Sequence, residues 1–177
     1  MKVAVLALDG VFDSGISAVL DVPHTADVLR GRVAGAPPPA FDIRTVGVRR
    51  RVRSGLGHRI GTEPVSVAED ADLLVVPALM ERRPEALVEA VASAACRPAR
   101  RVLAGARERG TPLATSCTGT FLLAEAGLLD DRRATTSWWL APLLPGPVPE
   151  GHARRDPDGR QFRGGSPRRA PPSAIST

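Results

Sequence analysis

Hydrophobic residues in this chain gather in short unbroken runs, each bounded by polar or turn-forming residues. The clearest predicted strands built on such runs span residues 2–8, 72–76 and 113–116, with polar residues at one end of each. Runs of this kind are typical of strands buried on both faces of a parallel sheet. Residues 41–46 alternate between apolar and polar types, which predicts one further strand.

Between these runs the apolar positions recur at helical spacing. The predicted helices span about 16–29, 84–95 and 98–109. Pro23 is expected to kink or break the first helix, and Leu87, Val88 and Val91 form the apolar side of the second. Strands alternating with helices predict an α/β protein, a three-layer flavodoxin-like sandwich with a mainly parallel sheet.

The last 35 residues differ sharply from the rest. From residue 143 onward there are seven prolines, five glycines and six arginines with little apolar periodicity, which predicts a disordered tail. The chain therefore divides into a folded domain, 1–142, and a tail, 143–177. The tail has six basic and three acidic residues, whereas the domain has 18 basic and 16 acidic residues. The overall charge of +5 is thus no sign of a polyanion-binding domain.

The sequence also indicates the cellular compartment of the protein. No apolar run approaches the roughly 20 residues that a membrane span requires, and the first eight residues lead into Asp9-Gly10 instead of a signal-peptide cleavage site. A cytoplasmic protein without membrane partners is expected, with Cys96 and Cys117 as free thiols. Residues 48–60 carry five arginines and predict an exposed hairpin. We favour a solvated face there over a polyanion site, because no aromatic side chains are interleaved.

The chemistry centres on Cys117, which lies on a predicted strand-to-helix turn. The helix after this turn is expected to lead into a second strand that ends in Ser137-Trp138-Trp139. Thr115 and Gly119, two residues before and after it, give the spacing of a nucleophile elbow. A thiol at a helix N-terminus tends towards the reactive thiolate, and the amides of Thr118, Gly119 and Thr120 could bind an oxyanion. The alternative is that Cys117 is a small buried residue, as Cys96 is expected to be.

Two further loops should lie beside this elbow, because reactive groups gather beyond the carboxyl ends of parallel strands. They follow the first strand and the strand at 72–76. The expected ligand-binding residues are Asp9, Gly10, Ala78, Cys117, Thr118 and Gly119.

A cysteine nucleophile usually needs a histidine base within hydrogen-bond reach. The three histidines are His24, His58 and His152, and the local pattern places none of them beside the elbow. No His or Cys residues have metal-ligand spacing, so neither a metal nor a cofactor is expected.

Three segments resemble the DJ-1/PfpI branch of the class I glutamine-amidotransferase-like superfamily, most of all the sensor domain of AraC-type transcriptional regulators. They are ATSCTGTFLLAEAGLLDDRRATTSWWLAPL, VAVLALDGVFDSGISAVLDV and ADLLVVPAL. The resemblance covers about residues 1–142 and makes Cys117 the family's elbow cysteine. The family commonly has Thr-Thr-His where this chain has Thr135-Thr136-Ser137, so Ser137 replaces the expected histidine. Asp13 is the candidate for the family's acid.

The resemblance implies a ligand-sensing domain of an AraC-type regulator that binds a small-molecule effector and does not catalyse a reaction. A homodimer is expected, with Trp138 and Trp139 in the core or at the dimer interface. Family members continue with a further strand and helix and then with helix-turn-helix units. We therefore expect a sheet incomplete at its C-terminal end and a chain truncated before its DNA-binding domain. The sharp break in composition suggests a tail from a shifted reading frame, and the alternative is a genuine disordered tail. DNA would be bound only through that missing domain.

Two alternatives from other functional classes remain open at this point. One is a stand-alone cysteine-dependent hydrolase or hydratase of the same superfamily, acting through Cys117. The other is a nucleic-acid-binding module that uses the arginine-rich hairpin and tail, although the chain shows no recognition-helix pattern.

Overall fold

Five parallel strands form the central sheet of the computed structural model, which describes residues 1–30, 32, 33, 35, 41–130, 132 and 134–144. The strand order is β5-β2-β1-β6-β7, and every neighbouring pair is parallel. The strands are β1 Lys2–Leu6, β2 Asp42–Gly47, β5 Glu63–Pro64, β6 Leu73–Val76 and β7 Leu113–Thr115. Their carboxyl ends therefore lie at one edge of the sheet, where the loops expected to form the site begin.

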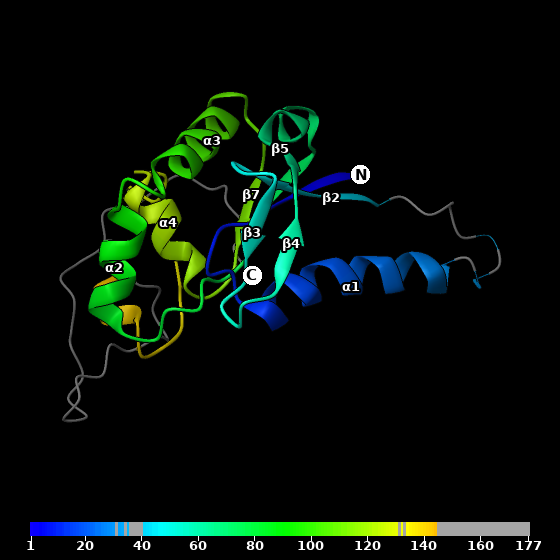
Figure 1. Ribbon diagram of the computed structural model, residues 1–177. Helices are drawn as coiled ribbons and strands as arrows, with labels where there is room; N and C mark the ends of the chain where they lie inside the picture. Colours follow the sequence, from blue (N-terminus) through cyan, green and yellow to red (C-terminus); the bar gives the residue numbers. More distant parts are fainter. Residues whose placement is uncertain (31, 34, 36–40, 131, 133, 145–177) are drawn as a thin grey trace.

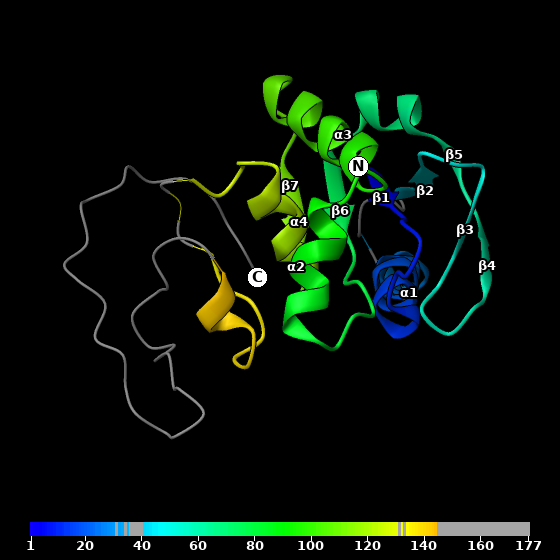
Figure 2. The same cartoon turned by 60° about the vertical axis from the view of Figure 1, so that its left-hand side comes forward.

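Helices cover both faces of this sheet (Figures 1 and 2). One face carries α1 Asp13–Arg30, and the other carries α2 Pro84–Ala92, α3 Arg97–Glu108 and α4 Gly119–Glu125. Two short 3-10 helices, η1 Val65–Asp70 and η2 Ala141–Leu143, complete the assignment. The predicted three-layer α/β architecture with a parallel sheet is confirmed.

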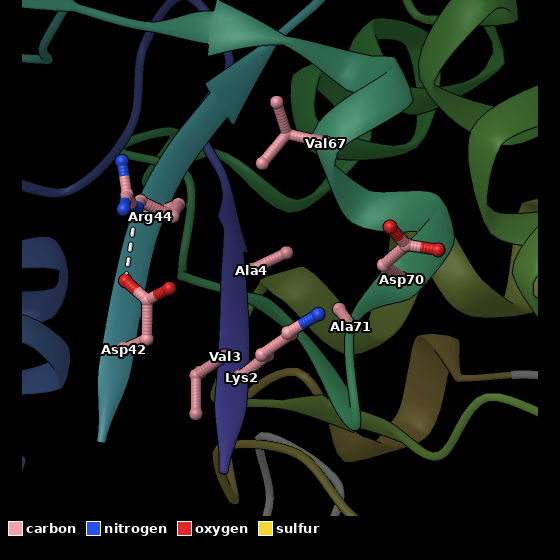
Figure 3. A pocket seen from close by; sticks show the side chains of 8 residues that line it. All are labelled: Lys2, Val3, Ala4, Asp42, Arg44, Val67, Asp70 and Ala71. Carbon is pink, nitrogen blue, oxygen red and sulfur yellow. Dashed lines mark hydrogen bonds and ion pairs between the residues drawn. The ribbon is translucent and has the colours of Figure 1, made fainter. Parts of the chain in front are cut away.

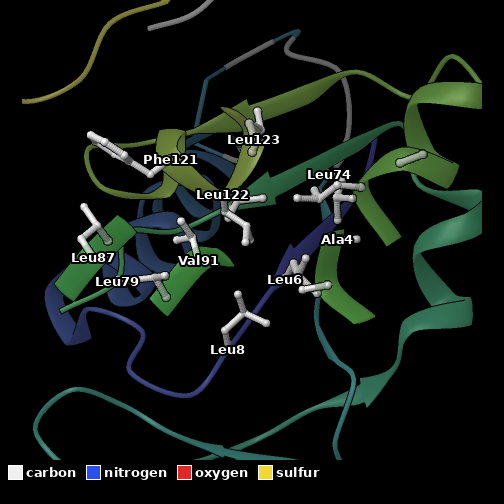
Figure 4. Close-up of a cluster of buried hydrophobic side chains, with 14 of the residues drawn as sticks. Ala4, Leu6, Leu8, Leu74, Leu79, Leu87, Val91, Phe121, Leu122 and Leu123 are labelled. Carbon is white, nitrogen blue, oxygen red and sulfur yellow. The ribbon is translucent and has the colours of Figure 1, made fainter. Parts of the chain in front are cut away.

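The larger hydrophobic core lies between the sheet and helices α2, α3 and α4 (Figure 4). Because side chains alternate along a strand, Ala4 and Leu6 of β1 point to this face and are 1% exposed. Helix residues that complete the core include Leu87, Val91, Leu103, Phe121 and Leu122. This core holds the short helix α4, and with it the candidate elbow, against the sheet.

A smaller core lies on the opposite face. Val3 and Val5 of β1 pack there against Ile16, which is the only fully buried residue of α1. A separate antiparallel ribbon, β3 Arg51–Arg53 with β4 Arg59–Gly61, contributes Val52 to the same cluster. The hairpin predicted over 48–60 is thus confirmed.

Three helix details differ from the prediction. α1 continues through Pro23 without a break, and α2 ends at Ala92. Val88 is 40% exposed and does not belong to the apolar side of α2. The reason is geometric, because Leu87 and Val91 lie one turn apart on the buried side and Val88 is rotated about 100° away from Leu87.

The prediction of a strand ending in Ser137-Trp138-Trp139 was wrong. Residues 134–137 have no strand assignment, and a turn follows them. This segment is held by side-chain hydrogen bonds to the elbow, from Thr120 Oγ1 to the Thr135 carbonyl (3.2 Å) and from Thr136 Oγ1 to the Cys117 carbonyl (2.8 Å). Trp138 is 82% exposed and does not lie in the core, so of the two places expected for it the dimer interface stays a prediction.

The fold extends to the last described residue, because Leu144 is 3% exposed and packs in the larger core. The rest of the predicted tail lies outside the described residues, as does most of the loop predicted at 31–40. None of the described helices combines the length and the apolar character needed to cross a membrane.

Candidate functional site

Cys117 occupies a strained turn between β7 and α4. Its φ angle is 52°, in the left-handed region, and it is the only described residue other than glycine with a positive φ. Such a conformation is costly for a residue with a side chain and is concentrated at functional sites. The cysteine is exposed. The predicted nucleophile-elbow geometry is therefore present, and the alternative that Cys117 is a small buried residue was wrong.

Gly119, the first residue of α4, allows the helix to start directly against β6. A Cβ atom at this position would lie 2.5 Å from Thr115 Oγ1 and 2.8 Å from the Val76 carbonyl oxygen. Real Cβ atoms do not approach other heavy atoms so closely. Glycine is therefore required here for packing, and the close approach fixes the elbow on the carboxyl end of β6.

Thr118 joins the elbow to the loop that follows β6. Its buried hydroxyl accepts a hydrogen bond from the Leu79 amide (2.7 Å) and donates one to the Leu79 carbonyl (2.8 Å). The Thr118 hydroxyl thus uses its donor and one acceptor site within the fold. Thr118 was predicted to bind ligand. In the structure its hydroxyl instead bonds to the backbone of Leu79.

The backbone donors at the elbow are fewer than the sequence suggested. The Gly119 amide donates to the Ser116 carbonyl (3.0 Å), and the Thr120 amide donates to the Cys117 carbonyl (3.3 Å). Within the described part of the chain, no hydrogen bond uses the amides of Cys117 and Thr118. These two adjacent N–H groups are the ones that could bind an oxygen atom near the thiol. The helix behind them has seven residues, so its dipole is small.

Ser137 lies directly beside the thiol, with 2.8 Å between its Oγ and Cys117 Sγ. Thr136, the residue before Ser137, donates a hydrogen bond to the Cys117 carbonyl and so holds Ser137 beside the thiol. The structure thus brings together the two residues that the resemblance paired, although they are 20 positions apart. A serine hydroxyl in this position can donate or accept a hydrogen bond, but it cannot take a proton as a base near neutral pH.

The histidines do not replace this missing base. His24 is exposed on α1, and the Nδ1 atom of His58 lies 2.6 Å from Asp13 Oδ1. No described histidine is hydrogen-bonded to Cys117, and His152 falls among the undescribed residues. Nor do the described residues contain a group of three His, Cys, Asp or Glu side chains that could hold a metal ion.

Asp13, the tentative acid, begins α1 and faces the turn of the ribbon. Besides His58, its carboxylate accepts a hydrogen bond from the Leu56 amide (3.0 Å). Hydrogen bonds from Ser54 and then His58 hold the pKa of Asp13 below its usual range. The carboxylate is therefore committed to the ribbon.

The lowered pKa of Asp13 predicts an effect on stability in acid. A carboxylate whose folded pKa is depressed stabilises the fold above its unfolded pKa of about 3.9, and this contribution is lost as the pH falls through the folded value. Between about pH 6 and pH 2.5 the free energy of unfolding should therefore fall less in Asp13→Asn than in the wild type. Urea unfolding followed by circular dichroism measures the free energy of unfolding of both proteins at each pH. An equal fall in the two proteins would contradict the stabilising role given to the Asp13 carboxylate. The control is Asp21→Asn, also on α1, which should behave like the wild type.

The remaining predicted residues lie in two loops that are hydrogen-bonded to each other. The Gly10 carbonyl accepts from the Met80 amide (2.7 Å), and the Ala78 carbonyl accepts from the Phe12 amide (2.7 Å). Asp9 points to the ribbon, where Oδ1 accepts the Arg53 amide (2.8 Å), and Oδ2 pairs with Arg49 just before the ribbon (2.7 Å). The loops after β1 and β6 thus meet as predicted, and Thr118 connects them to the elbow, but Asp9 serves the ribbon.

Two surface hollows lie elsewhere. One, of about 240 Å³, is at the amino end of the sheet and includes Lys2 and Asp70 (Figure 3). The other, of about 620 Å³, lies between α1 and β2 and includes His24. They share Asp42 and Arg44, which form an ion pair with 2.7 Å between Oδ1 and Nε. Neither hollow includes a residue predicted to bind ligand, so both hollows are separate from the elbow.

Comparison with known proteins relates this fold to a group of solved structures. No family model and no curated protein sequence matches the chain. An AraC family transcriptional regulator from Pseudomonas putida superposes with a TM-score of 0.58 and 23% identity over 75% of this chain. The chain spans 64% of the length of that regulator.

Two further structures carry the DJ-1 name. Drosophila melanogaster DJ-1beta has a TM-score of 0.60 and 18% identity, covering 81% of this chain and 69% of its own. A DJ-1 superfamily protein from Salmonella typhimurium has a TM-score of 0.58 and 21% identity, covering 83% of this chain and 72% of its own. The chain therefore has the DJ-1/PfpI fold, as the resemblance implied.

Proposed function

We propose that this chain is a ligand-sensing domain of the DJ-1/PfpI superfamily, of the kind found in AraC-type transcriptional regulators, and that it binds a small-molecule effector without converting it. The contact between Cys117 Sγ and Ser137 Oγ, 2.8 Å long, carries this proposal. A catalytic thiol needs a partner that can accept its proton, and a hydroxyl does not accept one near neutral pH.

The groups around the elbow suit binding better than turnover. The exposed Cys117 thiol, the Ser137 hydroxyl beside it and the unused amides of Cys117 and Thr118 provide several hydrogen-bond donors at the elbow. Such a group fits the oxygen atoms of a small carbonyl or carboxylate compound. The assignment to AraC-type regulators is supported by the likeness to the Pseudomonas putida regulator and by the resemblance of the elbow segment.

One observation favours the alternative of a cysteine-dependent hydrolase or hydratase. Cys117 keeps the strained φ of 52° and an exposed thiol, and both features suit a nucleophile. Geometry of this kind is equally compatible with a thiol that contacts a bound effector.

Thermal unfolding of the full chain with a panel of small carboxylates, amides and aldehydes tests the proposal. A compound that binds only the folded state at about 100 times its Kd stabilises it by about 2.7 kcal/mol. We expect at least one such compound to raise the Tm of the wild type, with a smaller shift in Ser137→Ala and no product detected by mass spectrometry. Turnover that disappears in Cys117→Ala would establish the enzyme instead.

A second variant tests whether the missing histidine alone accounts for the lack of turnover. Ser137→His places an imidazole beside the thiol, but Asp13 already binds His58 and Leu56. Without an acid to orient the new imidazole, we expect no hydrolysis of p-nitrophenyl acetate above the rate of Cys117→Ala. A rate above that control would contradict this expectation.

A further inference from the structure

The arginine-rich ribbon formed by β3, β4 and their connecting turn presents two different faces. Val52 is 4% exposed, and Ile60, its partner across the ribbon, is partly buried. Both pack against the smaller hydrophobic core. Because neighbouring side chains on a strand point to opposite faces, the residues on either side of Val52 and Ile60 point outward.

Three of those outward residues are arginines. Arg53 lies directly opposite Arg59, while Arg51 is two positions before Arg53 and faces Gly61. All three arginines are exposed. Like charges directly opposite each other across two strands destabilise the pairing. The ribbon therefore holds three positive charges on one face at a cost to its own stability.

The acids that bond to the ribbon do not neutralise this face. Asp9 pairs with the side chain of Arg49 and accepts only the backbone amide of Arg53 (2.8 Å). Asp13 bonds to His58 and to the Leu56 amide at the turn. No ion pair within the described part of the chain involves the guanidinium groups of Arg51, Arg53 or Arg59. These guanidinium groups are therefore available to an anion from outside.

The backbone that carries them is firmly attached to the domain. The Gly10 amide donates to the Arg53 carbonyl (2.8 Å), and the Gly55 amide donates to the Val11 carbonyl (2.8 Å). At the turn, the Ser54 amide donates to the His58 carbonyl (2.9 Å). A fixed backbone lowers the entropic cost of binding, because only the arginine side chains have to be ordered.

We propose that Arg51, Arg53 and Arg59 bind the phosphate backbone of duplex DNA without reading its sequence. Guanidinium groups match phosphate oxygens with two parallel hydrogen bonds, which suits arginine better than lysine. The residues from 48 to 60 include no Phe, Tyr or Trp on which an unpaired base could stack, and the one imidazole, His58, is held by Asp13, so a single strand fits less well. Phosphate contacts of this kind position a protein on the duplex but do not specify a base sequence.

This surface is distinct from the elbow, so the proposal does not depend on the effector site. It assigns a DNA contact to the domain itself, whereas the sequence alone favours a solvated face for the same arginines. The added observations are the shared outward face, the opposition of Arg53 and Arg59, and the absence of an acidic partner among the described residues.

Fluorescence anisotropy with a labelled duplex of mixed sequence tests the proposal on the full chain. Each phosphate contact contributes about 0.9 to the slope of log K against log salt concentration. In the triple variant Arg51→Ala, Arg53→Ala, Arg59→Ala we expect the slope to shrink by about 2 to 3. A duplex of unrelated sequence should give the same result.

The matched control is the triple variant Arg97→Ala, Arg101→Ala, Arg107→Ala. It removes the same charge from exposed positions of α3 and should keep the slope of the wild type. The triple variant Arg51→Lys, Arg53→Lys, Arg59→Lys keeps the charge, so it should keep the salt slope but bind DNA with lower affinity. This variant replaces the alanine variant in the test if the alanine variant fails to fold. Equal losses in both alanine variants would overturn the proposal. Binding of polyglutamate through the ribbon, without binding of DNA, would overturn it in favour of an acidic protein partner.

Discussion

Gly119→Ala should destabilise the protein by about 1 to 3 kcal/mol, the usual cost of adding an atom to a well-packed site. The added Cβ would meet the Val76 carbonyl oxygen at 2.8 Å and the Pro77 carbonyl oxygen at 3.0 Å. Both are backbone atoms of the strand end on which the elbow rests, so they cannot rotate away as a flexible side chain would. The start of α4 must move instead, and Cys117 moves with it.

The stability of this variant is measured by urea unfolding, and the position of the thiol by its rate of alkylation with iodoacetamide. In Gly119→Ala we expect the free energy of unfolding to fall and the rate of alkylation of Cys117 to differ from that of the wild type. The matched control is Gly105→Ala in the middle of α3, where the nearest atom to the new Cβ is the end of the Arg109 side chain at 3.2 Å. Alanine in a helix interior is favoured over glycine by about 0.5 to 1 kcal/mol, so this variant should be as stable as the wild type or more stable. A stable Gly119→Ala with unchanged alkylation would contradict the role given to Gly119.

Patterns governed by local geometry were the ones that could be predicted from the sequence. A continuous apolar run at β1 or β6 reports burial on both faces of a sheet, and this depends little on what the partner strands are. The spacing of Thr115, Cys117 and Gly119 predicted the elbow for the same reason, because a sharp turn between a strand and a helix has its own requirements. Ser137 was placed beside the thiol by family resemblance alone.

Features that depend on contacts distant in sequence could not be predicted in this way. Thr118 carries no sequence signal for its two bonds to Leu79, which is 39 positions away. His58 and Asp13 meet only because the ribbon folds back over the start of α1. Trp138 has the apolar character of a core residue, but residues 134–137 are tied to the elbow by side chains and the turn that follows leaves this ring exposed. A polar–apolar pattern cannot show which segments, distant in sequence, will contact each other.

Thr118→Val tests whether the elbow depends on one of these distant contacts. Valine keeps the shape of threonine but removes the hydroxyl that serves both the amide and the carbonyl of Leu79. A buried donor and a buried acceptor are then left without their partner, which costs about 1 to 3 kcal/mol for each group that water cannot reach. We expect the free energy of unfolding to fall by about 2 to 4 kcal/mol, by the same principle.

Loss of this bond should also loosen the connection between the elbow and the loop after β6, because Thr118 is adjacent to Cys117. Amide hydrogen exchange at Leu79 should therefore become faster in Thr118→Val by more than the change in global stability explains. Thr118→Ser keeps the hydroxyl and loses only a methyl group, so it should retain slow exchange at Leu79 with a smaller loss of stability. If Thr118→Ser and Thr118→Val behave alike, the methyl group and not the hydrogen bonds holds the elbow in place. The elbow would then not be joined to the loop after β6 through this hydroxyl.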